Sequence, residues 1–136
     1  MGAEILITGS LAWLIIWSFL GMLAGKQHPE WLEKVNKISE EGDLGKFWST
    51  YDSFMIQKTG HAHANSFAVV TFLIGLAMKV DLIGYSPQFQ TILAIWFFIG
   101  VILAGFGDRL RNVPLAAAGG ILFLTALIAS FIGLFV

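Results

Sequence analysis

The chain has no cysteine and few charged residues. Without a thiol among its 136 residues, it cannot form disulfide bonds, thiolate metal sites or a cysteine nucleophile. Only 12% of the residues are charged, which is about half of the fraction that soluble domains usually carry. The net charge of -1 provides no basic patch that would bind nucleic acid. The composition therefore favours an integral membrane protein with a single domain, residues 1–136.

Four apolar runs contain no Asp, Glu, Lys or Arg. They cover roughly residues 5–25, 60–78, 89–107 and 114–136. Each is close to the ~20 residues that a helix needs to cross ~30 Å of hydrocarbon, where only helices satisfy the backbone of a single segment. The first run lacks the basic start of a signal peptide, so we expect it to be retained. The sequence predicts an all-α membrane protein with four transmembrane helices.

The basic residues are distributed unevenly between the connections. Seven of the eight Lys and Arg residues lie in the connections after the first and third runs, and only Lys79 lies on the other side. Because cytoplasmic loops are rich in Lys and Arg, both termini are expected outside and the long first connection inside. The expected location is a prokaryotic cell membrane.

The first connection has a helical pattern of its own. Pro29 suits a helix start, and Trp31, Leu32, Val35 and Ile38 then recur along one face. A second set recurs at helical intervals: Leu44, Phe47, Trp48, Tyr51, Phe54 and Met55. We expect two short amphipathic helices lying at the membrane interface, within residues 29–57. Their aromatic residues either mark the headgroup level or cover the inner end of the second run.

Small residues are frequent in the last three runs. The set comprises Ala62, Ala64, Ala68, Gly100, Ala104, Gly107, Ala116, Gly119 and Gly120. Such residues let helices pack closely in lipid, or leave room for a flat cofactor. Ala116, Gly119 and Gly120 also offer a packing face for a homo-oligomer or for a larger membrane complex.

Two of the three histidines lie at the start of the second run. Successive helical residues turn by ~100°, so His61 shares a face with Asn65 and Ala68, whereas His63 lies almost opposite. The two imidazoles therefore cannot chelate one metal ion from a regular helix. A histidine inside a span is costly to bury and suggests function, although a hydrated interfacial histidine without a role is the alternative. His28, in the first connection, is expected to be an exposed helix cap.

Haem b is the cofactor that these residues suit best. His61 is the first choice for the iron ligand and His63 the alternative, with a partner needed for the second ring nitrogen. Asn65 and Ala68, on the His61 face, are expected to line the cofactor site. Arg109 and Arg111 lie on the same side of the predicted membrane and could pair with the propionates, or could serve only as topology charges. Further residues expected on this side are Lys46, Lys58, Trp48 and Tyr51, the two aromatic residues covering the cofactor edge.

The segment TGHAHANSFAVVTFLIGL resembles the second helix of haem–copper oxidase subunit I. The layout of spans and loops is also similar to that of styrene oxide isomerase and related four-helix haem b proteins. The resemblance implies that a histidine at the entry of the second helix binds the iron. The chain lacks the roughly twelve helices and the copper–histidine cluster of an oxidase. Its third run lacks the Asp, Asn and Tyr of the isomerase, so Asn65 and Tyr51 are the candidates for catalytic roles.

The preferred hypothesis is a haem b-binding membrane protein that carries electrons or isomerises a small hydrophobic substrate with iron as a Lewis acid. A five-coordinate haem would favour catalysis. Two histidine ligands would favour electron transfer, with the second expected from another subunit. The alternatives are a non-catalytic accessory subunit of a membrane enzyme complex and a small transporter. The transporter is disfavoured because no acidic residue lies in any run.

Overall fold

The computed structural model describes the backbone of residues 1–136 and every side chain except those of residues 56, 57 and 59. Its described secondary structure consists of helices: α1 (Gly2–Lys26), α2 (His28–Glu41), α3 (Leu44–Lys79), α4 (Pro87–Arg109) and α5 (Val113–Ile132). Four of them, all but α2, are long and apolar enough to cross a membrane. The prediction of four such helices in an all-helical chain is confirmed.

Short polar side chains fix the starts of three helices. Asp43 accepts a hydrogen bond from the backbone N–H of Lys46 at the start of α3, at 2.9 Å. Ser86 and Asn112 cap α4 and α5 in the same way, which satisfies N–H groups that have no partner within the helix. Gly42 ends α2 with a φ of 72°, a conformation that glycine adopts without strain. The Gly42–Asp43 pair therefore sets the tight turn between α2 and α3.

The continuity of α3 differs from the prediction. A separate interfacial helix up to residue 57, followed by a new span at residue 60, is wrong, because one helix of 36 residues runs through both segments. A single glycine costs a helix only ~1 kcal/mol, so Gly60 does not interrupt it. At 1.5 Å per residue α3 is ~54 Å long, well beyond the ~30 Å hydrocarbon core.

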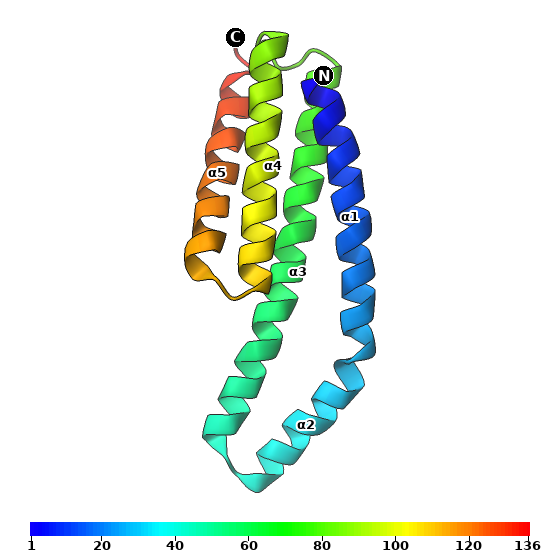
Figure 1. Cartoon of the computed structure of the whole chain (residues 1–136), viewed down its shortest axis with the longest axis vertical. Helices are drawn as coiled ribbons and strands as arrows, with labels where there is room; N and C mark the ends of the chain where they lie inside the picture. Colours follow the sequence, from blue (N-terminus) through cyan, green and yellow to red (C-terminus); the bar gives the residue numbers. More distant parts are fainter.

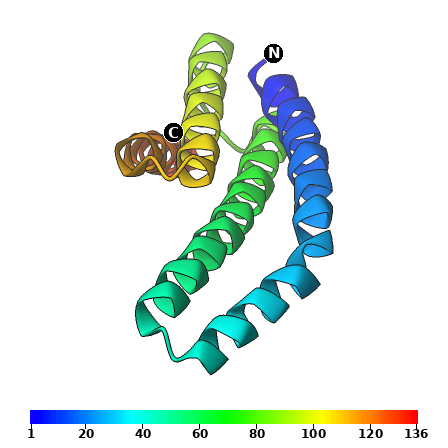
Figure 2. The ribbon, with the colours of Figure 1, turned by 60° about the horizontal axis from the view of Figure 1, so that its bottom comes forward.

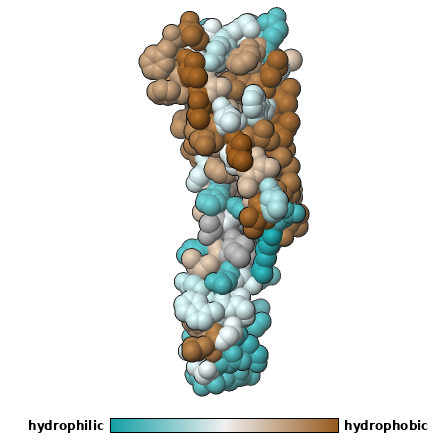
Figure 3. Space-filling view, turned by 90° about the vertical axis from the view of Figure 1, so that its left-hand side faces the viewer, coloured by the Kyte–Doolittle hydropathy of each residue, from teal (hydrophilic) through white to brown (hydrophobic). Residues whose placement is uncertain are grey.

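The first part of α3 and all of α2 form a helical hairpin. It projects along the long axis of the molecule, beyond the ends of α4 and α5 (Figure 1). Figure 3 shows mainly hydrophobic residues over the bundle and mainly hydrophilic residues over the hairpin end. Of the two amphipathic helices expected in the first connection, only α2 is a separate element.

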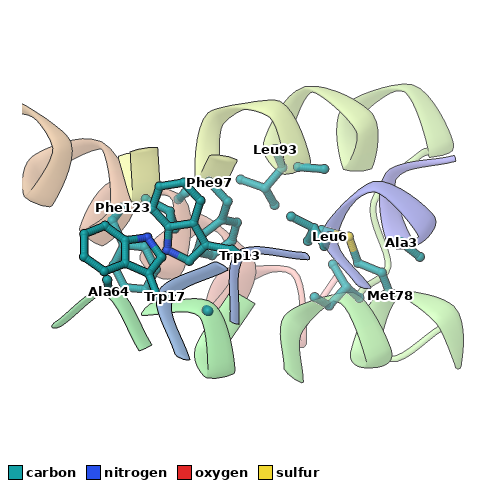
Figure 4. Packing of buried hydrophobic residues seen from close by; sticks show 14 residues of the cluster. Ala3, Leu6, Trp13, Trp17, Ala64, Met78, Leu93, Phe97 and Phe123 are labelled. Carbon is teal, nitrogen blue, oxygen red and sulfur yellow. The ribbon is translucent and has the colours of Figure 1, made fainter. Parts of the chain in front are cut away.

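The bundle is built around the pair α1 and α3. Helix α4 packs against both of them, and α5 packs on α4, on the side away from α1 (Figures 1 and 2). The core joins the helices through aromatic rings (Figure 4). Phe123 of α5 stacks on Phe67 of α3 at 4.3 Å between ring centroids and meets Phe97 of α4 edge-on at 5.5 Å.

Small residues bring α4 and α5 into close contact. A Cβ atom added at Gly119 would overlap the backbone of Ala104, and one added at Gly107 would overlap Ala116. Close helix packing, one of the two uses expected of these residues, is confirmed. Two of the three residues proposed for an oligomer face therefore pack inside the chain, whereas a Cβ at Gly120 would meet open space.

The two chain termini lie at the same end of the bundle, opposite the hairpin (Figure 1). At this end Glu4 of α1 forms ion pairs of 2.7 Å with Lys79 of α3 and with the N-terminal ammonium. The other seven basic residues belong to the hairpin end of the chain or to the connections beside it. The hairpin end therefore contains most of the basic residues, together with seven of the nine acidic residues, and the pocket described below lies at this end.

Candidate cofactor-binding pocket

A pocket of about 700 Å³ lies between the end of α1, the start of α2, the first half of α3 and the α4–α5 connection. This volume is within the usual range for small-molecule sites. The pocket forms because α1 and α3 diverge below the packed core, and α2 then leans back toward α3 at the tip of the hairpin (Figure 1). Residues of α2 and of the first part of α3, both from the predicted first connection, thus line the pocket together with His61.

The α1 wall of the pocket is apolar and carries small residues. Trp17, Leu20, Gly21, Ala24 and Gly25 all line it. They recur at intervals of three and four residues, so they form one face of the helix. This face was not predicted, since the small residues considered for packing or for a cofactor lie in the three later helices. Gly21 and Gly25 have the small-xxx-small spacing that could have revealed it.

His61 lines the pocket and is held from two sides. Its ring lies against Gly21, where an added Cβ would overlap the imidazole, and the Trp17 ring is 6.3 Å away. On its own helix, Asn65 Nδ2 lies 3.2 Å from His61 Nε2. The expectation that His61 and Asn65 share a face is confirmed. The position of the ring therefore depends on the missing side chain of Gly21 and on the amide of Asn65.

The Asn65 amide is a hydrogen-bond partner of one ring nitrogen of His61, and the roles of donor and acceptor depend on the tautomer. Nε2 is the nitrogen next to the amide, while Asn65 Oδ1 is buried without a hydrogen-bond partner in the described part of the chain. A half-turn of the amide lets Oδ1 accept a hydrogen bond from Nε2–H, which leaves the lone pair of Nδ1 free to bind a metal. An amide acceptor on one nitrogen is the partner that a ligating imidazole requires.

His63 lies on the other side of α3 and does not line the pocket. Its Nδ1 is 3.2 Å from Asp108 Oδ2 of α4, and its ring stacks on Phe67. The two side chains are 55% and 27% exposed, so the pair is partly hydrated. The expected contact of His63 with another helix is confirmed. Asp108 was not identified from the sequence.

Four cations line the pocket, and none of its described lining residues is acidic. They are Lys34 of α2, Lys58 of α3, and Arg109 and Arg111 at the α4–α5 connection. Three of them were expected beside His61, whereas Lys46 lies near Asp43 in the hairpin turn. Like charges that share a pocket without a carboxylate repel one another and favour an anionic ligand.

Arg111 is held in a strained conformation at this wall. Its φ of 55° is left-handed, a conformation that costs a residue with a Cβ roughly 1 kcal/mol more than glycine. The N–H of Asn112 bonds to the carbonyl of Gly107 at 2.8 Å, which closes the end of α4 around Arg111. The guanidinium Nη2 donates a hydrogen bond to Ser53 Oγ of α3. Asp81, with a φ of 56°, follows α3 in the same conformation outside the pocket, so this backbone geometry belongs to the end of the helix.

Aromatic residues of α2 and α3 form the wall opposite α1. Trp31 and Phe54 stack at 3.8 Å between centroids, and His28 lies within 6.0 Å of the Trp31 ring. Trp48 and Tyr51, the expected cover, do not line the pocket and instead pack with one another beside Phe47. That expectation placed the cover on the wrong face of the helix.

The lining face of α3 could have been identified from spacing. Thr50, Phe54, Lys58 and His61 follow at intervals of four, four and three residues. They form one stripe on a continuous helix, but the prediction divided the helix between residues 57 and 60 and so missed it.

His28 was expected to be a helix cap and is not one. The N-cap of α2 is Gln27, and His28 is the first helical residue, exposed but lining the pocket. Its ring also lies 5.4 Å from that of Phe54. The pocket thus has two imidazoles, from α2 and from α3.

The other predicted site residues lie elsewhere. Ala68 is 1% exposed in the core and does not line the pocket. Asn65 reaches the site only through His61, and Tyr51 lies outside it. Of the six residues predicted to bind the cofactor, His61, Arg109 and Arg111 are brought together. No cluster of three or more His, Asp or Glu able to hold a metal ion occurs among the described residues.

Comparison with protein-family models, with curated proteins and with solved structures finds no match to this chain. The features that bear on function are those of the pocket itself: its size, its imidazoles and its cations.

Proposed function

We propose that this chain is an integral membrane protein that binds haem b in the pocket, with His61 as the ligand of the iron. The observation that carries the proposal is the composition of the pocket at the end of the apolar bundle. His61 and four cations line it, and none of its described lining residues is acidic.

The residues present fit haem better than they fit a bare metal ion. Porphyrin supplies four nitrogen ligands to the iron, so the protein needs to add only one or two. A bare metal ion would need more protein ligands, and no group of three or more His, Asp or Glu that could hold one is found among the described residues. The macrocycle is flat and apolar, which suits Trp17, Leu20 and the small residues of α1. Its two propionates are anionic, which suits the cationic wall.

Each wall then has a distinct role. Asn65 and Gly21 orient the imidazole, Arg109 and Arg111 hold the carboxylates, and Trp31 and Phe54 limit access of water from the hairpin side. Haem, when bound, would supply a redox-active iron that can also act as a Lewis acid.

Between the two activities considered, electron transfer is better supported than isomerisation. The candidate catalytic residues do not reach the pocket directly: Tyr51 lies outside it, and Asn65 contacts the far nitrogen of His61. The titratable lining residues are cations and imidazoles, so a carboxylic acid that could protonate a substrate is missing from the described lining. A small hydrophobic substrate is therefore not part of the proposal.

The test is the absorption spectrum of protein purified in mild detergent from cells supplied with a haem precursor. We expect a Soret band in the wild type and in His63→Ala, and its loss in His61→Ala. The His63 variant is a matched control because both histidines lie on α3, two residues apart. If only His63→Ala loses the Soret band, His63 and not His61 is the ligand of the iron. A colourless wild type would overturn the proposal in favour of a non-catalytic accessory subunit.

A further inference from the structure

The pocket contains a second imidazole that the proposed function does not use. His28 and His61 both line it, and they come from different helices. His63, the remaining histidine of the chain, is paired with Asp108 on the opposite side of α3. The residues near the pocket thus supply two imidazoles, one on each side of the space between α1–α2 and α3.

The elbow between α1 and α2 determines the place of His28. Helix α1 ends at Lys26, and a single residue, Gln27, with φ of -86° and ψ of -7°, separates it from α2. Pro29 follows at the start of α2, where its missing N–H costs no hydrogen bond. The helix direction therefore changes directly before His28, at the rim of the pocket and not at the hairpin tip.

The ring of His28 is positioned by packing and not by polar contacts. It stacks on Trp31 with an angle of 15° between the planes, and Phe54 lies on the neighbouring helix at 5.4 Å. No hydrogen bond or carboxylate partner of His28 is found within the described part of the chain. A neutral imidazole held this way keeps a lone pair available to a metal.

We infer that His28 would be a second ligand of the haem iron, together with His61, because both residues line the pocket. The inference rests on the proposed function, because His28 has no comparable role without the cofactor. It replaces the expectation that a second subunit supplies this ligand. Ligation by both residues would tie the α1–α2 elbow to α3 across the pocket and leave no open coordination position, which is the arrangement of an electron carrier.

The test compares the spin state of the iron in the wild type with that in His28→Ala. Absorption and low-temperature electron paramagnetic resonance spectra should show six-coordinate, low-spin iron in the wild type. His28→Ala should retain haem but become high-spin, and its ferrous form should bind carbon monoxide at least tenfold faster. Added imidazole should restore the low-spin spectrum of His28→Ala, which shows that the variant is folded.

The outcomes separate the two proposals. Haem-loaded protein whose low-spin spectrum survives in His28→Ala, or whose wild type is already high-spin, would overturn the role of His28 and leave haem binding intact. Wild-type protein that takes up no haem would overturn both. Loss of haem from His61→Ala together with a low-spin to high-spin change in His28→Ala would support both.

Discussion

The contact between α4 and α5 and the space between α1 and α3 both contain small residues, yet one is closed and the other holds a pocket. At the closed contact, Gly119 lies against the backbone of Ala104, so small residues meet small residues. In the pocket, Gly25 shares the lining with Phe54 and Lys58, whose side chains are large. The contact is closed where a facing helix fills the space in front of the glycine, as at Gly119, and a hollow is left where nothing does, as at Gly25, where an added Cβ would meet nothing within 4 Å.

The largest expected effect comes from breaking the closed contact. In Gly119→Val the new side chain would overlap α4, whereas Gly120→Val meets open space on the same helix. Overpacking of this kind typically costs 1–3 kcal/mol, so we expect Gly119→Val to lower the free energy of unfolding by ~2–3 kcal/mol. Gly120→Val should change it by less than ~0.5 kcal/mol. Unfolding in detergent, followed by circular dichroism, measures both, and equal effects would mean that α4 and α5 are not packed as described.

The next effect concerns the pocket and not the fold. A Cβ at Gly21 would overlap the His61 ring, while a Cβ at Gly25 on the same wall has nothing within 4 Å. Moving the imidazole should weaken haem binding by at least about tenfold, equivalent to ~1.4 kcal/mol. Titration of apoprotein with haem would measure this for Gly21→Ala, with Gly25→Ala as the control. Identical haem affinities for the two variants would show that His61 does not bind the haem.

Substitutions of Arg111 should change the affinity for an anionic ligand more than they change the free energy of unfolding. Arg111→Gly relieves the left-handed strain, worth about 1 kcal/mol, but loses the hydrogen bond to Ser53, worth ~0.5–1.5 kcal/mol. The free energy of unfolding should therefore change little, while the affinity for an anionic ligand falls several-fold. Arg111→Lys keeps both the charge and the strain and should retain more affinity than Arg111→Gly. The account of the cationic wall is wrong if the glycine variant binds as tightly as the wild type.

The smallest effect is expected at the pair on the opposite face of α3. His63 and Asp108 are partly exposed, and such pairs contribute ~0–1 kcal/mol. Asp108→Asn should accordingly lower the free energy of unfolding by less than ~1 kcal/mol and leave the haem spectrum unchanged. A shifted Soret band in this variant would show that the two faces of α3 are coupled.

The sequence predicts the bundle better than it predicts the pocket. Absence of charge over four runs is sufficient to identify four apolar helices, because the cost of burying a charge in hydrocarbon is large. The fusion of the interfacial segment with the second span was missed, since Gly60 was treated as a boundary and a single glycine is a weak helix breaker.

The residues of the pocket depend on contacts between distant segments. Helical periodicity correctly paired His61 with Asn65, because both lie on one helix. Periodicity cannot show that α2 leans against α3, so the stacking of Trp31 on Phe54 and the place of His28 were not predicted. The choice of Trp48 and Tyr51 over Phe54 had a different cause, because the prediction divided α3 and so missed the stripe that joins Phe54 to His61.

Haem titration of detergent-purified apoprotein tests the central claim most directly, with wild type and His61→Ala compared at the Soret band. The account predicts saturation at one haem per wild-type chain, with binding by His61→Ala at least tenfold weaker and without the low-spin spectrum of the wild type. Linear, non-saturating uptake by the wild type, or superimposable titrations of the two proteins, would contradict it.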